Sequence, residues 1–331
     1  MGQETREAGL AKDRVLALLE EQAGEIVTGE ELARKLGVSR VAVWKIIKLL
    51  QERGCAIESV SRRGYRFVSR NGVLSEVFIQ SGLKTRFLGR RLEVLKSVDS
   101  TNAYIRRMDL TSTEAGFVVV ADGQTKGKGR KNRPFLSLPG EGLYMSILLK
   151  PDIPADETRF LTICAGLAVC EAIEALYDLN PQIKWVNDVW CDGKKLCGIL
   201  TEGAVSLELQ RMSHVVIGIG VNTGSVGEDL REIATSLGQL TGGSPDRNEL
   251  AAEILNRLEP FCIALAEGRK KELLDAYRSR QYVLGRTVQV FTGTETFSAL
   301  ATGIDDGGAL IVENETGRIR LSSEEVSLKL K

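Results

Sequence analysis

Histidine is almost missing from this chain, because His214 is the only one in 331 residues. Six cysteines are present, but no two of them stand in a Cys-x-x-Cys spacing. These scarcities argue against histidine acid–base chemistry and against a zinc site. The apolar run after His214 predicts the start of a strand. The cysteines are expected to be small buried thiols in a reducing compartment.

Long apolar runs are missing as well. The longest candidate, residues 160–177, is interrupted by Glu171 and Glu174 and predicts a core helix rather than a membrane span. The polar N-terminus has no signal-peptide core, and Arg6 breaks the myristoylation pattern. We therefore expect a soluble, cytoplasmic protein with no membrane partner.

The chain also lacks a net charge at pH 7, because its 44 Lys and Arg residues balance its 44 Asp and Glu residues. Any contact with nucleic acid must then come from a local patch. One such patch lies between residues 30 and 70, with ten Lys or Arg and four Glu. A chain of this length is expected to fold as two or three domains.

The first 70 residues predict a winged helix-turn-helix. The capping box Thr28–Glu31 opens a helix that Gly37 ends, and Ser39 caps a second helix. Residues 55–68 alternate like a hairpin with a basic tip, as a wing does. One alternative is a winged helix used only for protein contacts or dimerisation, with Trp44 packed under the wing. The charge favours DNA, and the expected contacts are Ser39, Arg40, Trp44, Lys45, Lys48, Arg62 and Arg63.

Beyond residue 92, helical and strand-like segments mix without a regular βαβ order. Strand-like runs such as 117–125 and 143–150 precede a long helical stretch at 158–179. This order predicts an α+β fold with a mixed or antiparallel sheet rather than a doubly wound one. Short alternating segments from residue 286 predict a small β-barrel of about five strands.

The loop QTKGKGRKNRP, residues 124–134, holds five cations, two glycines and no acid. It lacks the GxxxxGK[ST] phosphate loop, and Asn132 stands where the dinucleotide fingerprint has its third glycine. Its glycines still let backbone N–H groups approach an anion, although alone the loop is better explained as a mobile basic surface. Four other sequence elements favour a binding site over a surface loop: SVDSTNAY, KWVND, GKKLCGILTEG and GIGVNTG.

Together these elements resemble the bifunctional biotin protein ligase and biotin operon repressor family. The match covers essentially the whole chain. The family's DSTN, AxxQTxGxGRxxR, KWPND, KLxGIL and GxGxN elements correspond to Asp99–Asn102, Ala121–Arg133, Lys184–Asp188, Lys195–Leu200 and Gly218–Asn222. The resemblance implies a winged helix-turn-helix domain (1–70), a class II synthetase-like α+β ligase domain with a mixed or antiparallel sheet (71–280) and an SH3-like β-barrel (281–331).

The resemblance also implies the chemistry. Biotin carboxylate attacks the α-phosphate of ATP, and a lysine of a biotin carboxyl carrier protein, such as an acetyl-CoA carboxylase subunit, displaces AMP from the biotinyl-5′-adenylate. The implied ligands are ATP, biotin and Mg²⁺. The implied partners are the carrier, operator DNA and a second copy in a ligand-promoted homodimer, with the adenylate as corepressor.

Site residues follow from the same resemblance, and no metal ligand is assigned. The implied catalytic residues are Lys195, Arg130, Lys184 and Asp188, where Lys195 stabilises charge shared by carboxylate and phosphate and Asp188 orients or deprotonates the acceptor lysine. The implied biotin-binding residues are Ser100, Thr101, Asn102, Gln124, Gly127, Lys128, Gly129, Arg130, Lys195, Gly198 and Gly218. The implied nucleotide-binding residues are Arg130, Lys131, Arg133, Phe135, Asn187 and Asn222.

Four positions depart from the family pattern. Lys128 replaces an arginine, Asn132 a glycine and Val186 a proline, and Phe135 stands near the usual tryptophan. A biotin sensor that has lost ligation is an alternative, but the charged residues assigned to the chemistry are retained. A lipoate or octanoate transferase is a second alternative, against which the DSTN element, the basic loop and the DNA-binding domain all argue.

Overall fold

The computed structural model describes residues 14–52, 55–61, 63–69, 74–206, 211–292, 295–322 and 327–330. The chain divides into two compact units. The first comprises the chain up to Gly82 together with Asp246–Glu249, and the second comprises Leu83–Pro245 and Leu250–Lys331. The expected domain boundaries after residues 70 and 280 remain a prediction.

The first unit contains the predicted helix-turn-helix. Helix α2 (Gly29–Leu36) begins at Thr28, whose side chain accepts the Glu31 N–H at 3.1 Å, and ends at Gly37, which has a left-handed φ of 68°. Helix α3 (Arg40–Glu52) follows, and Ser39 Oγ accepts the Ala42 N–H at 3.1 Å. Both caps agree with the sequence.

The wing is a three-stranded antiparallel sheet. Strands β2 (Ala56–Val60) and β3 (Gly64–Ser69) form the hairpin, and the short β1 (Ile26–Val27) pairs with the other side of β3. Helix α4 (Glu76–Ser81) follows the wing. Apolar side chains from the helices and the hairpin share one core: Val15, Leu16, Leu19, Val27, Leu32, Ala33, Val43, Ile47, Leu50, Cys55, Ile57, Phe67 and Phe78.

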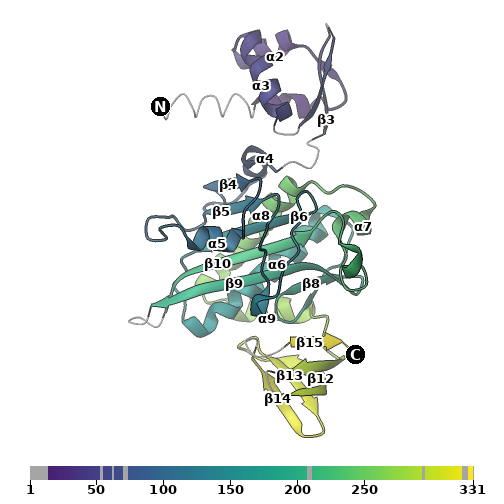
Figure 1. Ribbon diagram of the computed structural model, residues 1–331. Helices are drawn as coiled ribbons and strands as arrows, with labels where there is room; N and C mark the ends of the chain where they lie inside the picture. Colours follow the sequence, from purple (N-terminus) through teal and green to yellow (C-terminus); the bar gives the residue numbers. More distant parts are fainter. Residues whose placement is uncertain are drawn as a thin grey trace. The chain divides into compact units, whose positions relative to one another are not determined.

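The second unit is built on a seven-stranded sheet with the order β4-β5-β6-β10-β9-β8-β7 (Figure 1). Strands β4 and β5 run parallel, and the other neighbours are antiparallel, which confirms a mixed sheet in an α+β fold. The strands are β4 (Leu92–Leu95), β5 (Val118–Ala121), β6 (Gly142–Leu149), β7 (Gln182–Lys184), β8 (Asp188–Cys191), β9 (Lys194–Ser206) and β10 (Arg211–Asn222).

Helix α6 (Thr158–Leu176) is the predicted core helix, and it is buried along most of its length. It contacts β7, β8, β9 and β10 and also α9. Among the described residues, no helix has both the length and the apolar composition required to cross a bilayer. The other helices are α5 (Thr101–Arg106), α7 (Leu237–Thr241), α8 (Arg247–Ala266) and α9 (Lys270–Ser279).

The C-terminal strands form a separate antiparallel sheet with the order β14-β13-β12-β11-β15. About five strands were expected, and the described residues of this region form five. Among the described residues β14 and β15 remain the two edges, so the closure of an SH3-like barrel is not confirmed. The strands are β11 (Thr287–Phe291), β12 (Thr296–Ile304), β13 (Leu310–Asn314), β14 (Gly317–Leu321) and β15 (Ser327–Leu330).

Candidate functional site

One pocket of about 280 Å³ gathers most of the predicted site residues. Its walls come from the start of α5, from the basic loop and from strands β6, β7, β8, β9 and β10. Two predicted residues, Gly127 and Asn222, lie outside its lining. The predicted residues that line it are Ser100, Thr101, Asn102, Gln124, Lys128, Gly129, Arg130, Lys131, Arg133, Phe135, Lys184, Asn187, Asp188, Lys195, Gly198 and Gly218.

One wall, here called the amide–hydroxyl side, is lined by Ser100, Thr101, Asn102 and Gln124 and is hydrogen-bonded to the fully buried Ser146. Gln124 Oε1 accepts the Thr101 N–H at 2.8 Å and lies 3.1 Å from Thr101 Oγ1. The Ser146 hydroxyl lies 2.6 Å from both Thr101 Oγ1 and Asn102 Oδ1. Ser100 caps α5. Because Thr101, Asn102 and Ser146 are buried and the groups of this wall are bonded to one another, the wall is set before a ligand arrives.

Glycines on the adjacent strands make room for this wall and for Phe135. A Cβ atom at Gly218 would lie 2.3 Å from Asn102 Oδ1, and one at Gly220 would lie 2.6 Å from the Phe135 ring. Gly198 is the cross-strand partner of Gly220 and also borders Phe135. Side chains at these positions would fill the pocket, so the glycines of GxGxN and KLxGIL are needed for its shape.

The basic loop folds back on itself. The Gly129 N–H donates to Arg133 O at 2.8 Å, and the Phe135 N–H donates to Gly127 O at 2.9 Å. At the tip, Lys131 and Asn132 have φ values of 56° and 55°. This left-handed region favours glycine, and asparagine tolerates it better than most residues. The replacement of the family's glycine by Asn132 therefore fits the backbone found here.

The opposite wall, here called the cationic side, consists of Lys128, Arg130, Lys131, Arg133 and Lys195. Lys195 Nζ lies 2.8 Å from Asp188 Oδ1, and both side chains are partly exposed. Arg130 donates to Asn187 Oδ1 at 3.3 Å, and Asn187 Nδ2 donates to Ile199 O at 2.7 Å. The wall can thus present positive charge from one strand and a loop to one anionic ligand.

Comparisons with known proteins agree with this arrangement. The family model described as "Biotin/lipoate A/B protein ligase family" matches residues 94–222, an HTH domain model matches 12–66, and "Biotin protein ligase C terminal domain" matches 283–329. The bifunctional ligase/repressor BirA of Bacillus spizizenii is 36% identical over 96% of this chain and 98% of its own length.

The chain belongs to the bifunctional biotin ligase/repressor family. The Escherichia coli BirA protein is 29% identical over 91% of this chain and 92% of its own length. A biotin protein ligase from Aquifex aeolicus, solved in complex with biotin and ATP, superimposes with a TM-score of 0.65 at 31% identity. That match covers 73% of this chain and all of the Aquifex chain.

Three structural features of the family motifs were not predicted from the sequence. Asn222 donates to Thr235 O at 3.0 Å and so holds the segment after β10, outside the pocket lining. Lys184 lines the pocket, and its Nζ lies 4.2 Å from the centre of the Trp190 ring. The Trp185–Val186 peptide bond is cis, at the position where the family motif has proline.

The family motifs do not contain every residue that shapes the site. Met145, which lines the pocket, and Ser146, which bonds its wall, stand outside the motifs. Trp185 and Gly220 stand inside KWPND and GxGxN but were not among the predicted site residues. Gly220 could have been found, because residues 218 and 220 share one face of a strand. Ser146 could not, because a serine in the apolar run of β6 has no distinguishing pattern until the fold places it beside Asn102.

The lone histidine and the cysteines take no part in the pocket. His214 lies within β10, and burial together with nearby Lys150 and Arg106 lowers its pKa. The six cysteines, all among the described residues, form no disulfide, and burial raises the pKa of the Cys262 thiol to about 12. In the described part of the chain, no group of three or more His, Cys, Asp or Glu side chains is arranged to hold a metal ion.

Most of the residues predicted to contact DNA are exposed in the first unit. Arg40, Trp44, Lys45 and Lys48 are exposed on α3. Trp44 is 51% exposed, so its side chain is not packed beneath the wing. Ser39 serves as the cap of α3, and Arg63 is exposed in the wing. Arg62, which was also expected to contact DNA, lies outside the described residues.

Proposed function

We propose that this protein activates biotin with ATP, transfers it to a lysine of a carrier protein, and represses transcription when the adenylate is bound. One observation supports the enzymatic part most directly. A single pocket joins a polar wall suited to a small uncharged ring with a lysine and a basic loop suited to phosphate. The Aquifex relative, solved in complex with biotin and ATP, has the same fold.

Biotin is assigned to the amide–hydroxyl side. The hydroxyls of Ser100 and Thr101 and the amide of Gln124 can hydrogen-bond its ureido ring. Met145 and Ile219 line the same pocket and supply apolar contact for the rest of the molecule. The carboxylate then points towards Lys195, and the nucleotide takes the cationic side.

Adenylation requires a carboxylate oxygen to bond the α-phosphorus while the bond to the pyrophosphate oxygen breaks. Negative charge gathers between the two reactants, and Lys195 is placed to stabilise it. Asp188 holds the lysine until the anions arrive. Arg130 and the other loop cations hold phosphate oxygens, and closure of the loop keeps water from the acyl-adenylate.

Mg²⁺ is proposed to enter with the nucleotide. A hydrated Mg²⁺ ion bound to phosphates needs only one or two protein oxygens, and Asn187 and Asp188 provide carbonyl and carboxylate oxygens beside the loop. When bound, the ion neutralises phosphate charge. These two residues would hold it from the protein side.

Transfer requires the carrier's lysine nitrogen to bond the biotin carbonyl carbon while AMP leaves. We assign Asp188 a second task here, which is to orient or deprotonate that amine. Incubation with ATP, Mg²⁺, biotin and an apo carrier domain, followed by an avidin blot, tests the proposal. Labelled carrier is expected. Tight adenylate binding without any transfer would instead identify a sensor that has lost ligation.

Repression is proposed to use the exposed face of α3 and the wing. An operator with two half-sites would need two copies of the chain, so the adenylate is proposed to promote a homodimer. Gel shifts with and without biotin plus ATP test this, with sedimentation velocity as the measure of dimerisation. A shift that is indifferent to both ligands would remove the corepressor role.

A further inference from the structure

Two apolar side chains stand on the exposed face of α3, the second helix of the helix-turn-helix. Val41 is 64% exposed and Trp44 is 51% exposed, although Val43, Ile47 and Leu50 of the same helix are buried. Residues three apart in a helix are neighbours on its surface, so Val41 and Trp44 form one patch, here called the apolar pair. Two such side chains next to each other indicate a surface that a partner covers.

The charge around the apolar pair identifies the kind of partner. Arg40, Lys45 and Lys48 are exposed on the same helix. In the part of the chain that the structure describes, none of these three cations has a carboxylate partner, whereas Lys35 on α2 pairs with Glu31 at 3.0 Å. A second copy related by a two-fold axis would bring the same cations against them, whereas a duplex brings phosphates on both sides of a groove. DNA is therefore the occupant that complements this surface.

The position of Val41 along α3 is the one from which base edges are reached. Val41 stands in the first turn, directly after Arg40 and the Ser39 cap. In helix-turn-helix complexes, the N-terminal residues of the second helix contact base edges in the major groove. The 3.6-residue period places Val41 opposite the buried side of the helix, between Trp44 and Lys45. Val41 was nevertheless not among the residues that the sequence predicted to contact DNA.

The side-chain types of α3 limit which bases it can read. Hydrogen-bonded readout of adenine uses Asn or Gln, and readout of cytosine uses Asp or Glu. The stretch RVAVWKIIKLL, residues 40–50, contains none of these four residue types. Its cations can bind guanine, and thymine is the base whose C5-methyl group offers an apolar contact. Val41, which ends in two methyl groups, matches the thymine methyl.

We propose that Val41 and Trp44 are specificity-determining residues, which read the C5-methyl groups of thymines in the major groove of each operator half-site. Arg40, Lys45 and Lys48 then hold phosphates or a neighbouring guanine beside the apolar pair. The inference rests on the proposed repressor function and names the base chemistry that the operator must present. A half-site that lacks these methyl groups is bound more weakly.

The probe for the test is a duplex that the protein itself selects. The full chain, with biotin, ATP and Mg²⁺, is incubated with a pool of duplexes whose core is randomised, and the enriched duplex is resynthesised. Each thymine in turn is replaced by deoxyuridine, which removes the methyl group and keeps every hydrogen-bonding group. At a thymine read by Val41, Kd should rise about 3- to 10-fold, as expected for one buried methyl group.

Val41→Ala tests whether this residue reads that methyl group. The variant should bind the enriched duplex about 3- to 10-fold more weakly, and deoxyuridine at the same position should then cost it nothing further. Trp44→Ala should remove the deoxyuridine penalty at a second thymine of the half-site. Penalties that persist in full in both variants, or an enriched duplex in which every thymine can be replaced without loss, would overturn the proposal.

Leu49→Ala is the matched control within α3. Leu49 is a third exposed apolar side chain, 37% exposed, but it stands more than two turns beyond Val41. Its alanine variant should keep the Kd of the unaltered protein and every deoxyuridine penalty. A loss equal to that of Val41→Ala would attribute the effect to the helix as a whole and count against the proposal.

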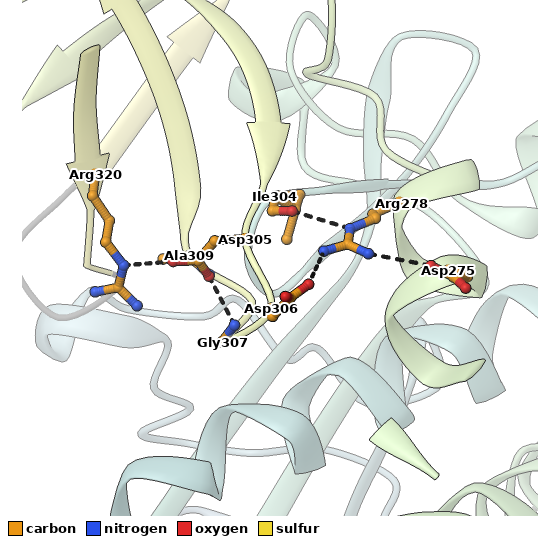
Figure 2. A network of polar contacts seen from close by, with 8 residues as sticks. All are labelled: Asp275, Arg278, Ile304, Asp305, Asp306, Gly307, Ala309 and Arg320. Atoms are coloured by element: carbon orange, nitrogen blue, oxygen red, sulfur yellow. Dashed lines mark hydrogen bonds and ion pairs between the residues drawn. The ribbon is translucent and has the colours of Figure 1, made fainter. Parts of the chain in front are cut away.

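Two charge variants separate the cations from the apolar pair. Lys45→Ala should weaken binding to every duplex and keep the deoxyuridine penalties, because the methyl contact is intact. Arg320→Ala also removes one positive charge, but from the second unit, where Arg320 pairs with Asp305 (Figure 2). Its Kd should be unchanged. If it weakened binding as much as Lys45→Ala does, net charge rather than the face of α3 would set the affinity, against the proposal.

The outcomes distinguish this inference from the function on which it rests. If no duplex is enriched, with or without the ligands, the repressor function fails and the inference fails with it. If a duplex is enriched but deoxyuridine is harmless throughout, the function stands and the inference alone fails. Weaker self-association of Val41→Ala in sedimentation velocity, with unchanged duplex affinity, would assign the apolar pair to a second copy of the chain instead.

Discussion

The two walls of the pocket differ in how much of their structure exists before a ligand binds. On the amide–hydroxyl side, Thr101 and Asn102 are buried and bonded to neighbouring side chains. On the cationic side, Lys128, Lys131 and Arg133 are exposed at the tip of a loop. The comparison indicates that the surface that recognises the shape of the ligand is formed by the fold itself. The cations that bind phosphate lie on a loop that must adjust to the ligand.

The largest expected effect tests whether the chemistry belongs to the cationic side. Lys195→Ala should lower the rate of adenylate formation about 10²- to 10³-fold, because it removes a preplaced charge from the reacting centre. Stopped-flow or pyrophosphate-exchange kinetics measure this. Lys194→Ala is the control, because Lys194 Nζ bonds Arg231 O and is absent from the pocket lining. A normal rate in Lys195→Ala would refute its role.

The next effect tests the claim that the amide–hydroxyl side is already set. Gly218→Ala places a methyl group against Asn102, and overpacking of this kind costs about 1–3 kcal/mol. Biotin affinity should fall about 10- to 100-fold in calorimetry without nucleotide. If the affinity stays normal, this wall is more adaptable than its hydrogen bonds suggest.

Alanine substitutions at two glycines compare how tightly the stem of the basic loop, at Gly127, and its tip, at Gly129, are packed. A Cβ atom at Gly127 would lie 2.5 Å from Phe135 O, whereas the nearest atom to one at Gly129 lies 3.7 Å away. Gly127→Ala should cost about 1–3 kcal/mol in urea unfolding, and Gly129→Ala less than about 0.5 kcal/mol. Equal losses would mean that the tip is as tightly packed as the stem.

The smallest effect concerns the family departure at Asn132. Asn132→Gly should change stability by only a few tenths of a kcal/mol, about the difference between two residues that accept a left-handed φ. Asn132→Val should cost about 1–2 kcal/mol, because a β-branched residue is strained there. Thermal unfolding measures both. If valine is tolerated as well as glycine, the tip does not hold this conformation.

Local features of the fold were predictable because they depend on short stretches of sequence. The Thr28 and Ser39 caps and the wing were anticipated, since capping and alternation involve only neighbouring residues. The mixed sheet and the core helix α6 followed from pattern and length in the same way. The family motifs then brought together most of the residues that line the pocket.

Long-range features were not predictable. Whether Asn222 faces the pocket depends on the segment that reaches Thr235, and whether the C-terminal strands close depends on pairings at their edges. The Lys195–Asp188 pair joins residues seven apart on two strands, so it appears only once the register of β8 and β9 is known. Such contacts are properties of the assembled sheet.

Counting hydrogens on the amide–hydroxyl side has a consequence for what the pocket can accept. Ser146 Oγ approaches Thr101 Oγ1 and Asn102 Oδ1, and Thr101 Oγ1 approaches Gln124 Oε1. These three contacts share only two hydroxyl protons, because both amide oxygens are pure acceptors. The wall is one proton short. A ligand that brings N–H groups can supply the missing hydrogen-bond donor. A ligand with only acceptor oxygens, or a bare hydrocarbon chain, cannot supply it.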